Sequence, residues 1–183
     1  LMTAEQGGMG WWCTGTVIAK RLVLTAAHCV EDATPGTKIK VMFGWSQAQG
    51  QPADYVPVTE WHHDPKYMMN NNIAAGHDAA VLILGADAKA PPIAINHTAL
   101  TQAMVGQPVH VVGFGNDNGQ SGTGAGTKRE IHTTLTSLEQ GVMNVGHSGQ
   151  TTCQGDSGGP SFMTIGGQTV VAGITSYGEM GCV

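Results

Sequence analysis

Charged residues are scarce in this sequence, and no stretch of it is strongly basic or apolar over a long distance. Only 11% of the 183 residues are charged, and the formal net charge is -5. Without a basic run, nothing attracts nucleic acid electrostatically. The longest apolar stretches, such as residues 79–84, are far too short to span a membrane. We therefore expect neither nucleic acid nor a membrane as a partner.

Cysteine is also rare, and no two cysteines have the Cys-x-x-Cys spacing. That absence argues against a zinc site. An even number of cysteines in a glycine-rich chain of low charge favours two disulfides and an oxidising compartment instead. Four cysteines allow three pairings, and spacing alone does not choose between them. The four are Cys13, Cys29, Cys153 and Cys182.

Glycine, by contrast, is abundant, with 27 residues that can supply the positive-φ positions of tight turns. Short β-type runs alternate with Gly, Pro, Asn or Asp clusters, and no long stretch keeps a helical period. This pattern predicts an all-β barrel or sandwich. The expected strands are at residues 16–18, 22–24, 39–43, 55–58, 79–84, 109–112, 130–138, 161–165 and 169–174. Residues 90–108 contain three prolines and no strong strand pattern, so we expect them to connect two halves.

Two polar residues beside apolar runs are candidates for chemistry. His28 follows small residues and precedes Cys29, which can hold the imidazole firmly while its ring stays exposed. Asp78 directly precedes an apolar run, where a buried carboxylate needs strong hydrogen bonds, such as one from an imidazole N–H. Taken singly, each residue type is more often structural, as a half-buried histidine or a turn aspartate. We give the other histidines that structural interpretation: His62, His63, His77, His97, His110, His132 and His147.

The run from Cys153 to Pro160 gives the sharpest signal. Glycines around Ser157 let backbone N–H groups converge on one point, where they can stabilise a developing oxyanion. A polar surface turn is the structural alternative. The run also fits the Gly-x-Ser-x-Gly elbow of lipases and esterases, but that fold requires a histidine after the serine, and none follows Ser157. The order His28, Asp78, Ser157 is instead the chymotrypsin order.

These three stretches resemble the signature stretches of trypsin-like serine proteases. Gly113-Phe114-Gly115 is similar to the family's Gly-Trp-Gly turn, and Ser176-Tyr177-Gly178 is similar to its Ser-Trp-Gly substrate strand. The resemblance runs in unbroken order from about Cys13 to Cys182. It implies two packed antiparallel six-stranded Greek-key barrels with the site between them. Residues 1–99 would form the N-terminal barrel and the start of the connector, and residues 100–183 the C-terminal barrel.

The resemblance also implies a secreted serine endopeptidase in which His28, Asp78 and Ser157 form the catalytic triad. The backbone N–H groups of Gly155 and Ser157 would form the oxyanion hole. Asp156 would pair with the α-amino group that zymogen cleavage releases. We expect protein or peptide substrates, protein protease inhibitors as further partners, a monomeric state, and neither cofactor nor metal.

Substrate recognition is likewise carried over by resemblance. Ser176, Tyr177 and Gly178 would offer backbone groups to an extended substrate, beside Gln154, in a form of strand addition. Thr151 matches the base of the primary pocket, where enzymes specific for Lys or Arg carry a carboxylate. We therefore expect cleavage after uncharged residues, aromatic or large aliphatic ones first. The implied disulfides are Cys13–Cys29 beside the histidine loop and Cys153–Cys182 beside the pocket.

Both ends of the sequence depart from the family pattern. The mature N-terminus Ile-Val-Gly-Gly has no match in residues 1–4, and the sequence stops one residue after Cys182. No signal peptide is recognisable at Leu1. We therefore expect a mature, trimmed or fragmentary chain whose barrels are incomplete at both termini. A second hypothesis follows, namely an inactive or fragmentary protease-fold binding module, although all three triad residues are retained.

Overall fold

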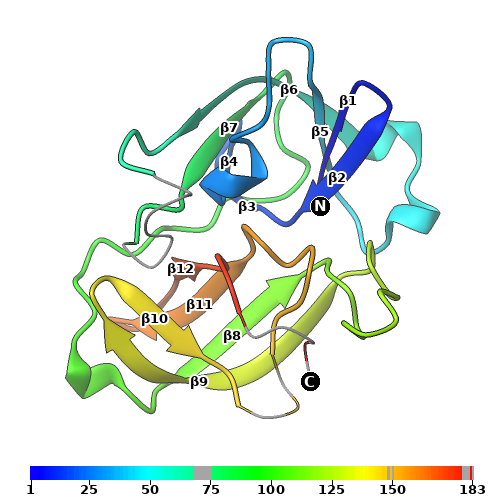
Figure 1. Cartoon of the computed structure of the whole chain (residues 1–183). Coiled ribbons are helices and arrows are strands. Elements are labelled where there is room, and N and C mark those ends of the chain that lie inside the picture. Colours follow the sequence, from blue (N-terminus) through cyan, green and yellow to red (C-terminus); the bar gives the residue numbers. More distant parts are fainter. Residues whose placement is uncertain (68–75, 148, 150, 179–181, 183) are drawn as a thin grey trace.

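The chain forms two curled antiparallel β-sheets that lie one above the other (Figure 1). The computed structural model describes residues 1–67, 76–147, 149, 151–178 and 182. The all-β class with two sheets is confirmed, and the described strands divide seven to five rather than six to six. Within the described part, no helix is long and apolar enough to cross a membrane.

The upper sheet in Figure 1 contains the N-terminal strands in the order β2-β1-β5-β6-β7-β4-β3. Their bounds are β1 Met2–Gln6, β2 Met9–Cys13, β3 Thr16–Ala19, β4 Leu22–Thr25, β5 Lys38–Met42, β6 Tyr55–His63 and β7 Ala80–Leu84. Short 3₁₀ helices interrupt the loops of this half: η1 Ala27–Cys29, η2 Gln47–Gln49 and η3 Pro52–Asp54. The buried side chains of this sheet, including Met2, Val23 and Leu82, form one apolar core.

The lower sheet has the order β10-β9-β8-β11-β12. Its strands are β8 Pro108–Gly113, β9 Arg129–Glu139, β10 Val142–Val145, β11 Pro160–Ile165 and β12 Gln168–Ile174. Strands β8, β9 and β10 follow one another as neighbours, and β11 returns beside β8, which is a Greek key. Its separate core is built on Val109, Val111, Leu135 and Met163.

Residues 85–107 link the two sheets and run down one side of the view in Figure 1. Apart from the 3₁₀ helix η5 (Gln102–Met104), the segment has no helix or strand among the described residues. Near its middle it is hydrogen-bonded to both sheets: the Ile93 N–H donates to the Val17 carbonyl at 3.0 Å, and the Asn96 N–H donates to the Val171 carbonyl at 2.8 Å. This position fits the predicted connector, while the domain boundary after residue 99 stays a prediction.

Candidate active site

Strand register brings His28 and Asp78 together. Strands β4 and β7 are antiparallel neighbours in which Thr25 lies opposite Ala80. His28 follows the end of β4 in helix η1, and Asp78 precedes the start of β7. Because the end of one antiparallel strand lies beside the start of its neighbour, the two residues reach the same edge of the sheet.

The Asp78 carboxylate is buried and fully engaged by hydrogen bonds. The His28 ring binds it through Nδ1 at 2.7 Å from Oδ2, and the His28 backbone N–H donates to Oδ1 at 2.9 Å. The Ser176 hydroxyl also donates to Oδ2. Burial alone would raise the pKa of Asp78, but these three hydrogen bonds outweigh it and lower the pKa below its usual value. Asp78 is therefore ionised at neutral pH and can orient the His28 ring.

Antiparallel register also brings Ser157 and Ser176 to one edge of the second sheet. Strands β11 and β12 are antiparallel, with Pro160 opposite Ile174. Two further hydrogen bonds extend this ladder beyond the strands: Thr175 N–H to the Gly159 carbonyl and Gly158 N–H to the Thr175 carbonyl, both at 2.8 Å. Ser157 therefore lies just before the ladder and Ser176 just after it, and both come to the side that faces the first sheet.

Two backbone N–H groups of the loop around Ser157 have no acceptor among the described residues. Gly155 has φ of +94°, a conformation that favours glycine. Neither the Gly155 nor the Ser157 N–H donates to an acceptor within the described residues. Among the described residues, the His28 ring is hydrogen-bonded to Asp78 and not to the Ser157 hydroxyl. Such bonds are often long in a free enzyme and shorten when substrate binds.

Thr14 joins the two sheets and was not singled out by sequence reasoning. It is fully buried directly after β2. Its N–H donates to the Ser157 carbonyl at 2.7 Å, its hydroxyl donates to the Gly155 carbonyl at 2.9 Å, and the Phe114 N–H donates to that hydroxyl at 3.0 Å. Thr14 thereby fixes the serine loop against the histidine half. Only its place next to Cys13 hinted at this, because a lone threonine carries no such signal.

Asp156 lies in a niche that two glycines leave open. A Cβ on Gly113 would overlap the Asp156 carboxylate, and one on Gly115 would lie 2.7 Å from its Cγ. The carboxylate accepts hydrogen bonds from the N–H groups of Gly115 at 2.7 Å and Cys153 at 2.8 Å. Burial raises the pKa of Asp156, and these two hydrogen bonds together with the charge of Arg129 oppose the rise only in part. The site would therefore gain from a further cation beside Asp156.

The predicted specificity residues have different surroundings. Thr151 lines a cavity of about 210 Å³ that Asp156 and Cys182 also line, and its buried hydroxyl has no hydrogen-bond partner among the residues that the structure describes. Gln154, Tyr177 and Gly178 are exposed. Thr151 and Asp156 thus line the same cavity. The place of Thr151 at the base of the primary pocket stays a prediction.

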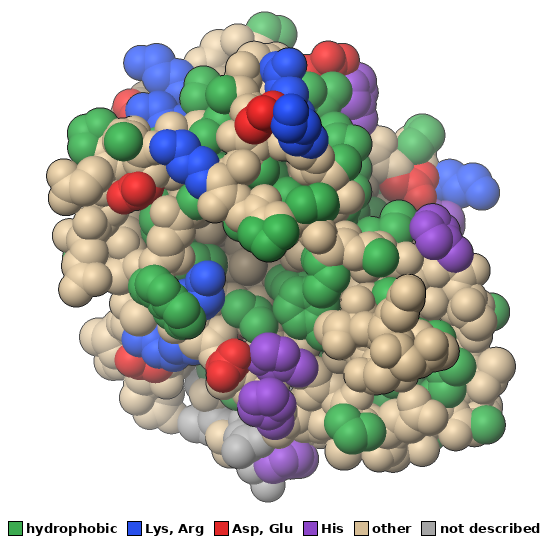
Figure 2. Space-filling view, turned by 180° about the vertical axis from the view of Figure 1, so that it is seen from behind, with side chains coloured by type: hydrophobic (Ala, Val, Ile, Leu, Met, Phe, Trp, Pro, Cys, Tyr) green, Lys and Arg blue, Asp and Glu red, His purple; other side chains and the backbone are tan. Residues whose placement is uncertain are grey.

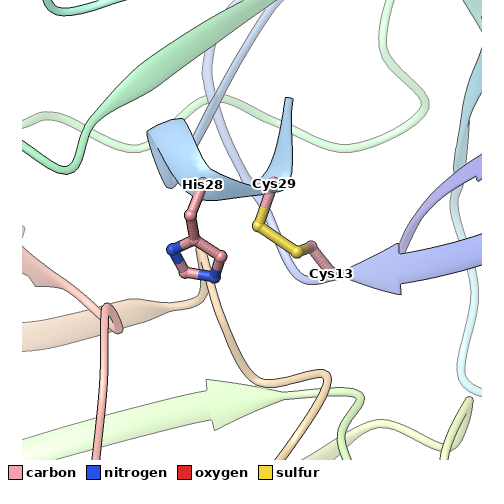
Figure 3. A group of neighbouring side chains, drawn as sticks. All are labelled: Cys13, His28 and Cys29. Atoms are coloured by element: carbon pink, nitrogen blue, oxygen red, sulfur yellow. A yellow bond between two sulfur atoms is a disulfide. The ribbon is translucent and has the colours of Figure 1, made fainter. Parts of the chain in front are cut away.

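The two disulfides join Cys13 to Cys29 and Cys153 to Cys182, with Cα–Cα distances of 6.3 and 5.2 Å. The first lies next to His28, as Figure 3 shows, so that His28 and both sulfurs lie close enough to suggest a metal site. That grouping cannot act as one, since disulfide sulfurs are not thiolates. The ring also uses Nδ1 for Asp78. The bridge instead anchors η1 to the end of β2.

Removing the Ser176 hydroxyl is expected to destabilise the fold in a pH-dependent way. In a Ser157→Ala background, which prevents self-digestion, Ser176→Ala removes one hydrogen bond to a buried charge and should lower the free energy of unfolding by about 1.5–3 kcal/mol at neutral pH. The pKa of Asp78 is depressed, so this stability is present above the unfolded value near 3.8 and is lost as pH falls through the folded value. Urea unfolding should show the difference at about pH 7 and a smaller one at a pH below the unfolded value. An equal difference at both pH values would contradict the coupling.

Comparison with known proteins identifies the family of the chain. The family model described as Trypsin matches residues 2–183. The chain is 30% identical over 201 residues to chymotrypsin-like elastase family member 1 of Bos taurus, covering 97% of this chain and 73% of the relative. It is 31% identical over 184 residues to a trypsin of Saccharopolyspora erythraea, covering 93% and 77%. Among solved structures it is similar to neuropsin, a serine protease expressed in the limbic system of mouse brain, with a TM-score of 0.75, 25% identity, and coverage of 99% and 83%. A match over nearly the whole sequence, together with the paired sheets, establishes that the chain belongs to the trypsin family of serine proteases.

Proposed function

We propose that this chain is a secreted serine endopeptidase that hydrolyses peptide bonds through an acyl-enzyme, with His28, Asp78 and Ser157 as its triad. The observation that carries the proposal is the buried Asp78 carboxylate bonded to His28 Nδ1 at 2.7 Å. The Ser157 loop is fastened to the histidine half through Thr14. An orphan carboxylate this deeply buried would be costly, so its engagement with an imidazole is a strong functional signal.

The proposed reaction uses the two ring nitrogens of His28 for different tasks. Asp78 occupies Nδ1, which leaves Nε2 to accept the Ser157 proton as the hydroxyl attacks the substrate carbonyl. The imidazolium then donates that proton to the leaving amine, and a water molecule repeats the sequence to release the acyl group. The ionised Asp78 stabilises the imidazolium while it exists.

The N–H groups of Gly155 and Ser157 would bind the oxyanion of the tetrahedral intermediate. Their lack of acceptors within the described residues supports this role. A donor that is already in place needs no reorganisation during the reaction, and losing one such donor costs about 10²–10³ in turnover. Asp156 would hold the loop in shape by pairing with an α-amino group, because burial raises its pKa and a neighbouring cation would offset that effect.

For specificity, we propose cleavage after uncharged residues, aromatic or large aliphatic ones first. Thr151 would stand at the pocket base without a charge, and Gly178 would leave the entrance open. Ser176, Tyr177 and Gly178 would pair with substrate backbone, with Gln154 at the rim. A cleavage profile on a diverse peptide mixture should show this preference, and dominant cleavage after Lys or Arg would contradict it.

The setting follows from the same chemistry. Both disulfides support an oxidising, extracellular location. The partners would be extended segments of proteins or peptides, and protein inhibitors that enter the site in the same extended form. We propose that the enzyme acts as a monomer.

Labelling with a fluorophosphonate probe tests the proposal. The probe reacts with an activated serine and should modify the unaltered chain at Ser157, with no labelling of Ser157→Ala. Ser121→Ala, a change at an exposed serine, is the matched control and should label normally. A chain that binds peptides but resists the probe would be a binding module of the protease fold, and labelling that persists in Ser157→Ala would refute the assignment of the nucleophile.

A further inference from the structure

A second cluster of functional side chains lies on the outer face of the C-terminal sheet. Val109 and Val111 of β8 point into the core, so His110 between them points outward. In β9, Thr133 and Leu135 are buried, whereas Glu130 and His132 are exposed. The space-filling view from behind shows histidines gathered beside an acidic side chain on the lower half of the molecule (Figure 2). Alternation along two strands thus places three potential metal ligands on one face.

Strand register then brings these three side chains into contact. His110 lies directly opposite His132 in the β8–β9 ladder, and Glu130 is two residues from His132, so it lies diagonal to His110. The two imidazole rings stack with centroids 4.4 Å apart and planes 6° from parallel. The Glu130 carboxylate reaches both rings, with one oxygen 2.8 Å from His110 Nε2 and the other 4.0 Å from His132 Nε2.

We propose that His110, Glu130 and His132 bind a divalent transition-metal ion, with Zn²⁺ as the best match. Their three ligand atoms all lie within 4.8 Å of one another. Tetrahedral zinc with bonds of about 2.0–2.2 Å would bring them to about 3.3 Å apart. Two imidazoles and one carboxylate form a donor set that zinc uses when a fourth position is left to water. Ca²⁺ and Mg²⁺ prefer oxygen ligands and fit this set poorly.

The cluster can adjust to the metal without disturbing the fold. Its side chains remain accessible, with 34% of His110, 60% of Glu130 and 76% of His132 exposed, so small rotations can close the remaining distance. The strands that carry them are already paired, so little ordering of the backbone is needed. A surface ion pair between histidine and glutamate would by itself contribute little to stability. A bound ion would instead tie β8 to β9 and stabilise the native state by linkage.

Zinc binding to the whole chain tests this site separately from catalysis. In a Ser157→Ala background, equilibrium dialysis with Zn²⁺ alone should detect binding that His132→Asn weakens by more than about tenfold, since even losing a ligand's supporting partner costs about 10- to 100-fold. Glu130→Gln, which keeps the shape of the side chain, should weaken it similarly. His62→Asn is the matched control, because His62 is another exposed histidine bonded to a single glutamate, at 2.7 Å, and should leave this binding unchanged.

Thermal unfolding supplies a second readout and a check on folding. Zn²⁺ should raise Tm of the parent and of His62→Asn above the value in EDTA, and this rise should be lost in His132→Asn and Glu130→Gln. In EDTA, all three variants should unfold near the Tm of the parent, because the substituted side chains are exposed. The proposal is overturned if the parent binds no Zn²⁺, or if either cluster variant, once shown to be folded, binds it as tightly as the parent. One folded cluster variant is enough to decide.

Discussion

Replacing Asp78 by asparagine is expected to lower kcat on a peptide substrate by about 10⁴-fold, with little change in KM. The amide keeps the size of the carboxylate, but it has no negative charge to accept the Nδ1–H hydrogen bond of His28. The neutral ring is therefore held in the wrong tautomer, and the imidazolium loses its counterion. Steady-state kinetics near neutral pH measure the effect. Because the pKa of Asp78 is lowered, the wild-type carboxylate is ionised at the pH of this assay.

A second histidine–aspartate pair in the same half of the molecule is the control. His77 Nδ1 lies 2.9 Å from Asp64 Oδ2, so Asp64→Asn removes a charge from a similar contact outside the triad. It should change kcat by no more than a few fold, since surface substitutions shift free energies by about 0.5 kcal/mol or less. If Asp78→Asn retained more than a tenth of the activity, the assignment of Asp78 would be wrong.

Gly158→Ala is expected to destabilise the protein by about 4 kcal/mol or more, a size that only severe overpacking and strain produce together. Gly158 has φ of +80°, which L side chains rarely adopt. An added Cβ would overlap Thr25 Oγ1 and the Thr14 carbonyl and lie 2.9 Å from Ala26 N. These atoms belong to the buried junction between the sheets and cannot withdraw. Denaturant unfolding in a Ser157→Ala background measures the loss.

Gly106→Ala separates backbone strain from overlap. Gly106 has φ of +88°, but an added Cβ would meet nothing within 4 Å. Gly106→Ala should therefore lower the free energy of unfolding only by the cost of backbone strain, about 1–3 kcal/mol. Equal losses at Gly106 and Gly158 would show that the packing of the serine loop against Thr14 and Thr25 contributes little.

All nine strands expected from the sequence are present, at shifted bounds, and the three that were missed have identifiable causes. The first hairpin, β1 and β2, turns at Gly7 and Gly8, both with positive φ. A Gly-Gly dipeptide between two strand-forming runs is a recognised hairpin signal, so this hairpin is encoded locally. Strand β10 is only four residues long and half-buried throughout, so no alternation marks it.

The candidate site divides in a similar way. Residue types and chain order were enough to select His28, Asp78, Ser157 and the glycines beside the serine, because the acid–base and oxyanion chemistry requires those groups. The pairing of the cysteines came only from family resemblance. The role of Thr14 could not be predicted from the sequence, since its three hydrogen bonds depend on loops from both sheets.

Local sequence by itself determined the all-β character and the chemically useful residues, because strand periodicity, turn glycines and side-chain reactivity are properties of short segments. The tertiary structure alone decided which distant residues meet. Antiparallel register sets β4 against β7 and β11 against β12, which gathers the candidate active-site residues, and it sets His110 opposite His132. A register depends on the packing of whole sheets, so no single segment encodes it.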